Sequence, residues 1–372
     1  MISEQDHPAH AGGPGASPDT GPFQISVDAM GGDHGPSVVV AGCARAVGEN
    51  PELHILLHGD TSLLEPLVAR QPALTGRCVL RHADRAVTME DKPSHIMRHG
   101  KDTSMWSAID ALRQGEAQAA VSCGNTGALM AVSMLQLRRM EGVTRPAIAC
   151  LWPSRGKHGF NTMLDVGADV KADAQDLLAY AIMGATYFRN GFNEARPRVG
   201  LLNVGVEEHK GRAEIKAAHE LIAQHQETGR YEFVGFVEGS DIPSARVDVI
   251  VTDGFTGNIA LKTGEGTAKL VSDSLRIALR SNLVSMLGAL LAKRSLEQLG
   301  ARIDPRRVNG GVFLGLNGTV VKSHGSADET GVAAAVRLAA KLAQSGYRGR
   351  MAERLVIAAQ GAQESEPEGE SE

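Results

Sequence analysis

The sequence is poor in aromatic residues and has no excess of positive charge. Phenylalanine, tryptophan and tyrosine make up 4% of its 372 residues, and the formal net charge is −5. Proteins that bind single-stranded nucleic acid stack bases on aromatic side chains and hold the phosphate backbone with cations. The composition therefore argues against nucleic acid as a partner. It also predicts a core built mainly from alanine, valine, leucine and isoleucine.

Cysteine is scarce as well. The four cysteines, Cys43, Cys78, Cys123 and Cys150, form no CxxC pair and no cysteine–histidine spacing typical of a zinc site. We therefore expect no metal site, and we interpret each cysteine as a small residue with a reduced thiol.

Long apolar runs are missing too. None approaches the roughly 20 residues of a membrane-spanning helix, and the polar first residues do not resemble a signal peptide. The expected location is the cytoplasm. Residues 1–23, rich in Gly, Pro, Ala and Ser, and the acidic residues 361–372 are predicted to be disordered. A single α/β domain is expected over residues 24–360.

Within that domain, short apolar segments alternate with longer helical patterns. Helical spacing is clear in residues 102–116 and 173–191, each beginning near Asp and ending near Gly. This alternation predicts a three-layer α/β/α fold with a largely parallel central sheet. Predicted strands include residues 25–30, 53–59, 78–83, 119–124, 147–153, 160–167, 198–205, 231–239 and 247–254.

Five predicted strands end in a polar turn that contains glycine. The turns read DAMGGDHG, SCGNTGA, DVGADVKAD, NVGVEEHKG and TDGFTGN. Ligands of open α/β sheets bind beyond the carboxyl ends of the strands, so these turns together predict a composite site for an anionic ligand. Neither GxGxxG nor a Walker-type GxxxxGK motif occurs at a strand end, which argues against a nucleotide site of either kind.

The turn after residues 247–252 contains the clearest candidate phosphate site. A helix is expected to begin near Asn258, with Lys262 about one turn further on. Backbone N–H groups at the helix start and the lysine ammonium can together hold a phosphate. The simpler alternative is a capped helix with a solvated lysine.

Other turns add further candidates. Lys210 in EEHKG either binds phosphate or polarises a carbonyl, or else belongs to a solvated loop. Asn125 and Thr126 are good N-cap residues, and their turn offers N–H groups to an anion. Lys322 and His324 precede the last helix. No GxSxG elbow occurs, so a hydrolase with a serine nucleophile is not expected.

Residues 268–292 have a different character. Apolar residues recur at every fourth position from Val271 to Leu291, and residues 273–307 contain seven Lys or Arg against three Asp or Glu. Two interpretations stay open and can both hold. One is a helical hairpin that packs in the core or in a dimer, and the other is an amphipathic element at a membrane surface.

Seven motifs together resemble one family. DAMGGDHGP, SCGNTGALM, RPAIA, LDVGADV, PRVGLLNVG, DVIVTDGFTGNIALKT and LGLNGTVVKSHGSAD occur over roughly residues 24–345. Their order is similar to that of PlsX-type phosphate acyltransferases. The resemblance implies acyl transfer from acyl carrier protein to inorganic phosphate, which gives an acyl phosphate for phospholipid synthesis.

The same resemblance implies a fold like that of isocitrate and isopropylmalate dehydrogenases and of phosphotransacetylases, with a protruding helical hairpin at about residues 268–300. It implies no cofactor, a homodimer, and peripheral association with the inner face of the cell membrane. A downstream glycerol-3-phosphate acyltransferase is then a candidate partner. Phosphate can attack a thioester directly, so positioning and oxyanion stabilisation replace a protein nucleophile.

Candidate roles follow from the resemblance. Catalysis is assigned to Asp253, Asn258 and Lys262, with Gly257 beside them and Lys210 opposite. The remaining candidates are a substrate-binding wall of Gly31, Gly32, Asp33 and His34, further substrate-binding residues Asn125, Thr126, Lys322 and His324, carrier-docking residues Arg98 and Lys101, and membrane-contact residues Leu283, Met286, Leu287, Leu290 and Leu291. The docking segment has fewer cations than is usual in the family.

Three alternatives compete with this interpretation. A soluble phosphotransacetylase that uses coenzyme A is disfavoured by the basic, apolar hairpin. A nicotinamide-dependent dehydrogenase of the same fold is disfavoured only weakly by the missing fingerprint. A non-catalytic membrane scaffold leaves the lysine-bearing glycine turns unexplained.

Overall fold

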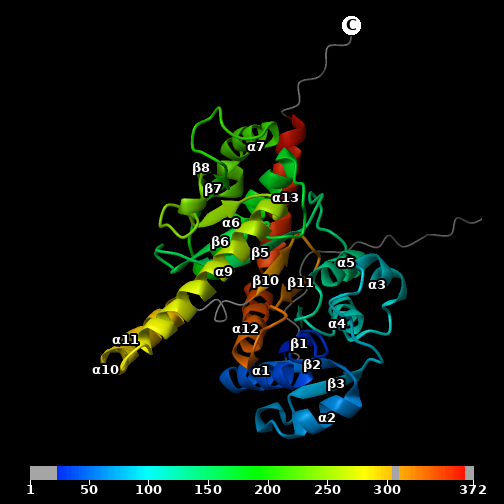
Figure 1. Ribbon diagram of the computed structural model, residues 1–372. Helices are drawn as coiled ribbons and strands as arrows, with labels where there is room; N and C mark the ends of the chain where they lie inside the picture. The colour runs from blue at the N-terminus through cyan, green and yellow to red at the C-terminus, as the bar shows by residue number, and fades with distance from the viewer. Residues whose placement is uncertain (1–22, 304–309, 365–372) are drawn as a thin grey trace, which may run out of the picture.

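Eleven strands form one sheet at the centre of the computed structural model, which describes residues 23–303 and 310–364 (Figure 1). Their order across the sheet is β3-β2-β1-β4-β11-β10-β5-β6-β9-β7-β8. The strands are β1 (Phe23–Asp28), β2 (Leu53–Gly59), β3 (Cys78–His82), β4 (Ala119–Ser122), β5 (Ala147–Pro153), β6 (Phe160–Leu164), β7 (Arg198–Leu202), β8 (Glu232–Val237), β9 (Val249–Val251), β10 (Gly311–Leu314) and β11 (Thr319–Lys322).

Most neighbouring strands run parallel, as the alternating pattern predicts. The antiparallel pairs are β5 with β6, β5 with β10, and β10 with β11. Strands β10 and β11 were not among the predicted strands, because each has only four residues and lies beside glycine-rich turns. They fill the centre of the sheet and join its two parallel halves, β3-β2-β1-β4 and β6-β9-β7-β8.

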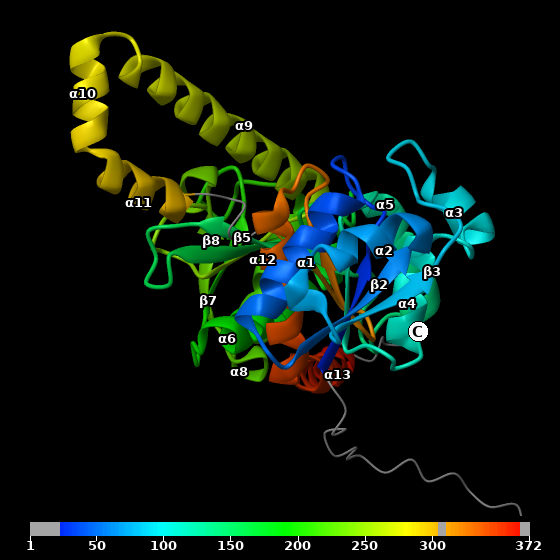
Figure 2. The same ribbon diagram turned by 90° about the horizontal axis from the view of Figure 1, so that it is seen from below.

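Helices cover both faces of the sheet and form the two outer layers (Figures 1 and 2). The helices are α1 (Pro36–Glu49), α2 (Thr61–Ala69), α3 (Pro93–His99), α4 (Ser104–Arg113), α5 (Thr126–Leu137), α6 (Ala174–Phe192), α7 (Ala213–Gln224), α8 (Gln226–Gly229), α9 (Gly254–Leu279), α10 (Leu283–Leu291), α11 (Lys293–Ile303), α12 (Glu329–Ser345) and α13 (Tyr347–Glu364), with short 3-10 turns at Pro72–Leu74 and Gly239–Asp241. The predicted three-layer fold is confirmed.

Each face of the sheet has its own apolar core. Helices α1, α6, α12 and α13 contribute to one core, and α4 and α5 contribute to the other. Strand β10 shows the alternation that this requires, since Val312 and Leu314 lie in the first core and Phe313 lies in the second. Burial on both faces explains why the strands are rich in Val, Ile and Leu.

Helices α9, α10 and α11 form an arm that extends away from the sheet (Figure 2). The arm does not begin at residue 268, because the helix that follows β9 continues without a break from Gly254 to Leu279. Asp253 caps this helix, so it begins four residues before the predicted start at Asn258. One continuous helix therefore joins the predicted phosphate turn to the apolar arm.

The ends of the chain differ partly from the prediction. Helix α13 continues to Glu364, so residues 361–364 are helical and do not belong to a disordered tail. Its last residues, AAQGAQE, are mostly strong helix formers, which explains the extension. The remaining segments that were predicted to be disordered, residues 1–22 and 365–372, lie outside the described residues.

Candidate active site

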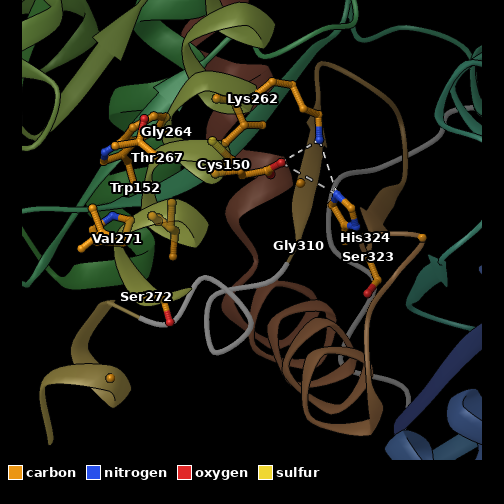
Figure 3. Close-up of a pocket in the computed structure, with 18 of the residues that line it drawn as sticks. Cys150, Trp152, Lys262, Gly264, Thr267, Val271, Ser272, Gly310, Ser323 and His324 are labelled. Atoms are coloured by element: carbon orange, nitrogen blue, oxygen red, sulfur yellow. Dashed lines mark hydrogen bonds and ion pairs between the residues drawn. The ribbon is translucent and has the colours of Figure 1, made fainter. Parts of the chain in front are cut away.

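A cavity of about 1540 Å³ lies where α9 passes the carboxyl ends of the central strands (Figure 3). Polar groups from five separate chain segments line one end of it. They come from the turns after β1 and β4, from the end of β11 and the turn after it, from α5, and from the second and third turns of α9. The polar side chains at this end are Asp33, Thr126, Asn258, Lys262, Glu265, Lys322, Ser323 and His324.

The start of α9 is held by other protein groups. The Asp253 carboxylate accepts a hydrogen bond from the Thr256 N–H at 2.7 Å, and it also pairs with Arg212. The Gly254 N–H donates to the Asp169 carbonyl at 2.8 Å. These two N–H groups are therefore unavailable to a phosphate. The predicted contribution of helix-start N–H groups does not hold for them, and side chains become the main candidate ligands.

Asp165 organises the loop beneath this helix. Its buried carboxylate accepts hydrogen bonds from the backbone N–H groups of Ile148, Gly167, Ala168 and Asp169 at 2.6–3.1 Å. A Cβ atom at Gly257 would lie 1.9 Å from the Asp165 carbonyl oxygen, so only glycine permits this contact. The close approach of the two segments fixes Asn258, one residue further on, at the cavity wall.

Lys262 lies next to an acidic and an imidazole group. Its ammonium is 2.8 Å from Glu265 and 3.4 Å from the Nε2 atom of His324 (Figure 3). Burial lowers the pKa of His324, and the positive charge of Lys262 lowers it further, so the imidazole is mainly neutral at pH 7. Glu265 was not predicted, although it lies one helical turn after the lysine.

Lys322 is more enclosed than Lys262. Its ammonium donates to the carbonyl oxygens of Cys123 at 2.9 Å and of Ser323 at 2.6 Å. Burial lowers the pKa of Lys322 to about 8, and the nearby carboxylates of Asp28 and Asp33 only partly oppose this shift. The lysine can therefore lose its proton within a few pH units of neutrality.

The turn after β1 packs against the turn after β4. Asp28 is buried and accepts hydrogen bonds from Ser104 Oγ and Ser122 Oγ, each at 2.7 Å. A Cβ at Gly31 would lie 2.6 Å from the Gly124 nitrogen, which explains the glycine. Gly32 has a positive φ of 100°, and this conformation places the Asp33 N–H 2.8 Å from the Gly325 carbonyl.

These two turns place only some of their predicted residues at the cavity. Asp33 and Thr126 line it, whereas His34 is exposed and is not a lining residue. Asn125 caps α5 by accepting from the Ala128 N–H, and its amide donates to the Met89 carbonyl at 3.0 Å. Gly31, Gly32 and Asn125 thus shape the loops, while Asp33 and Thr126 face the cavity.

Lys210 is not brought to the cavity. It lies on the loop after β7, pairs with Glu207 at 2.8 Å, and is not among the residues that line the cavity. Its neighbour Arg212 instead reaches Asp253. Asp253 and Gly257 likewise do not line the cavity, and their contacts position α9.

Arg98 and Lys101 are both exposed, on and just after α3. The start of α3 lies close to the start of α5, because a Cβ at Gly127 would be 3.0 Å from Pro93 Cγ. The start of α3 thus lies beside Thr126 at the cavity wall, whereas Arg98 and Lys101 lie at the other end of α3 and just after it.

Comparison with known proteins places the chain in a family. A family model described as "Fatty acid synthesis protein" matches residues 23–350. A phosphate acyltransferase from Cereibacter sphaeroides (strain KD131) is 65% identical over 348 residues, covering 94% of each chain. One from Paracoccus denitrificans is 66% identical over 331 residues, covering 89% of this chain and 90% of that relative. This chain belongs to the PlsX-type phosphate acyltransferases.

Solved structures show the same fold at much lower identity. A phosphotransacetylase from Streptococcus pyogenes matches with a TM-score of 0.58 and 16% identity, covering 87% of this chain and 94% of that one. The EutD phosphotransacetylase from Staphylococcus aureus matches with a TM-score of 0.57 and 13% identity, covering 86% and 94%. The expected phosphotransacetylase-like fold is thereby confirmed.

For this phosphate acyltransferase, sequence reasoning identified most of the polar groups at the cavity. It did not identify Glu265, the loop-forming role of Asp165, or the Arg212 contact with Asp253. Asp165 stands in LDVGADV, one of the motifs noted in the sequence, and that motif was the available signal. The pairing of Arg212 had no sequence signal, because 41 residues separate it from Asp253.

Proposed function

We propose that this phosphate acyltransferase takes its acyl group from acyl carrier protein and transfers it to inorganic phosphate, forming an acyl phosphate for phospholipid synthesis. One observation carries the proposal. A single cavity has lysines, a histidine and an amide at one end and a long apolar wall at the other. That arrangement fits a phosphate and a fatty acyl thioester bound side by side.

Phosphate binding is assigned to side chains. Lys262 and Lys322 supply positive charge, and Asn258 and Thr126 supply hydrogen-bond donors. Two of the three donors of the Lys322 ammonium are bonded to backbone carbonyls, which aim the group and fix its position. A fixed cation costs little reorganisation when charge develops on the reacting oxygens.

The chemistry needs no covalent enzyme intermediate. A phosphate oxygen attacks the thioester carbonyl carbon and forms a tetrahedral oxyanion. This intermediate collapses to the acyl phosphate and releases the carrier's thiolate, which takes a proton from water. A thiol with an ordinary pKa of about 8.5 is a good leaving group and requires no strong acid. Burial raises the pKa of Cys150, which also lines the cavity, to about 12, and this disfavours it as a nucleophile.

Carrier docking is assigned to the exposed face of α3. Arg98 and Lys101 are exposed at its end, and its start packs against the α5 start that lines the cavity. A short thioester arm from an acidic carrier bound at this face would enter at the polar end. Such surface cations chiefly raise the association rate, so neutralising them is expected to weaken binding most at low salt.

The arm is assigned to membrane contact and dimerisation. Leu283 and Leu291 of α10 are 83% and 81% exposed, and Leu287 is 59% exposed. Met286 and Leu290, 52% and 66% exposed, also line the cavity. Exposed leucines on one short helix next to basic residues suit a lipid interface. In the described part of the chain, no single helix is long and apolar enough to span a bilayer. Helices α9 and α10 taken together have the length and composition of a membrane span, but a bend of 116° separates them.

The direct test mixes purified protein, a long-chain acyl carrier protein and inorganic phosphate, and traps acyl phosphate with hydroxylamine. The expected product is a hydroxamate that forms only when phosphate is present. The same assay with acyl-coenzyme A as donor separates the proposal from a coenzyme A-dependent phosphotransacetylase. A higher kcat/KM for acyl-coenzyme A would favour that alternative, and no phosphate-dependent hydroxamate with either donor would refute both.

A further inference from the structure

The apolar part of the cavity follows one face of α9. The residues of α9 that line it recur at helical spacing, with Leu261, Gly264, Ala268, Val271 and Leu275 among them. Leu270 and Ile277 are 67% and 72% exposed on the same helix, yet they do not line the cavity. The helix thus has two apolar surfaces, and only one of them is continuous with the polar site.

Other elements flank this face of α9 and form a channel that stays open to solvent, since Val271 and Leu275 are 57% and 42% exposed. On one side lies β5, where Trp152 packs so tightly that a Cβ at Gly264 would be 2.4 Å from the indole ring (Figure 3). On the other side lie α10 and α11, which contribute Met286, Leu290 and Leu296. The channel therefore begins beside Lys262 and continues into the arm.

Cations mark the far end of the apolar stretch. Arg276, Arg280 and Lys293 line the cavity beyond Leu275, where they alternate with the apolar Leu279. From Lys262 to Leu275 the helix advances by about 20 Å, at about 1.5 Å per residue. An extended chain of about sixteen carbons, built from single bonds of about 1.5 Å, spans about 19 Å. The length from Lys262 to the first of these cations thus corresponds to a long-chain fatty acyl group.

We infer that this channel holds the acyl chain of the donor, and that Val271 and Leu275 determine how long a chain the enzyme accepts. The inference rests on the proposed acyl transfer at the Lys262 end. The acyl chain fits this channel because the channel opens directly into the polar site and its first far cations lie about one long-chain acyl length from Lys262. A second copy of the chain on the same surface is the competing occupant, and the test below separates the two.

The test compares tryptophan variants on the two surfaces of α9. Leu275→Trp narrows the far end of the channel, and Ile277→Trp places the same side chain on the surface outside it. Each variant is assayed with acyl carrier proteins bearing 8 and 16 carbons. Leu275→Trp is expected to lower kcat/KM for the 16-carbon donor by at least about 15-fold. This is the loss expected when two methylene groups can no longer be buried in the channel, since each contributes about fourfold to binding. The 8-carbon donor and both Ile277→Trp assays should stay near wild type.

A second variant gives the test a graded outcome. Val271 lies one helical turn nearer the site, about 6 Å or about five carbons from Leu275. Val271→Trp should therefore lower the length limit by about five carbons relative to Leu275→Trp, measured across donors of 6 to 18 carbons. Both positions are more than 40% exposed, at 57% and 42%, so the larger side chain requires little repacking of a core.

Three results would overturn the inference. One is no change in kcat/KM for the 16-carbon donor in Leu275→Trp, and another is an equal loss of kcat/KM for every donor. The third is a change of oligomeric state by sedimentation that accounts for the loss, which would assign the surface to a second copy of the chain. Failure of the proposed function looks different, because wild-type protein would then show no phosphate-dependent turnover with any donor.

Discussion

Lys322 provides a test of the phosphate site through pH. Its ammonium lines the cavity, and burial lowers its pKa to about 8. If the protonated lysine binds phosphate, the KM for phosphate must rise as the pH passes through this value. For a base with a lowered pKa, the charged form is present below about pH 8 and is lost above it.

The size of the effect follows from the pKa. With a pKa of about 8, the protonated fraction falls from about three quarters at pH 7.5 to about one thirtieth at pH 9.5. Only this fraction binds phosphate tightly, so the KM should rise by about 25-fold between these pH values. The rise in KM cannot exceed the contribution of the charge-assisted hydrogen bond to phosphate binding, which is about 1.5–3 kcal/mol, or about 10- to 150-fold in KM.

The assay measures the KM for phosphate from pH 7.5 to 9.5 in wild type, Lys322→Met and Lys322→Arg. Lys322→Met should have a raised KM at pH 7.5 and keep only the pH dependence of phosphate itself. Lys322→Arg stays charged throughout this range and should flatten the profile. Circular dichroism checks folding, because both variants change the bonds to the Cys123 and Ser323 carbonyls. Parallel profiles for wild type and Lys322→Met would refute the role.

Three further predictions concern other parts of the molecule. Lys262→Ala should lower kcat/KM for phosphate by about 10- to 150-fold, which corresponds to the loss of one charge-assisted contact. Lys210 lies outside the cavity, so Lys210→Ala should change kcat/KM by less than about threefold. Equal losses in the two variants would show that Lys210 also acts at the active site. Gly257→Ala should unfold at lower temperature or displace the start of α9, because its Cβ would lie 1.9 Å from the Asp165 carbonyl oxygen, and a wild-type melting temperature together with full activity would contradict this. Leu287→Glu should release the protein from anionic vesicles in a flotation assay, with a stability change within about 0.5 kcal/mol at this exposed position; a variant that floats like wild type would remove α10 as the membrane contact.

The order of the elements and the choice of active-site turns could be read from the sequence because both depend on local signals. Buried parallel strands are continuous apolar segments, and glycine turns at their ends mark where a backbone must pass close to another group. Asp33, Thr126, Asn258, Lys262, Lys322 and His324 were identified in this way, and the structure places all six at one cavity. Their roles in phosphate and thioester binding stay predictions.

What the sequence could not decide depends on contacts between distant segments. Asp253 and Lys210 belong to motifs that indicate a binding site just as clearly. In the structure, however, Asp253 accepts hydrogen bonds from the Thr256 N–H and from Arg212, and Lys210 forms an ion pair with Glu207. The strands β10 and β11 gain their stability from pairing with β5 and β4 rather than from their own four residues. The apolar stripe of the arm was visible as a period of four. The packing of α9 against Trp152 and α10 showed that the stripe of Val271 and Leu275 lines the cavity, whereas the apolar Leu270 and Ile277 face outward.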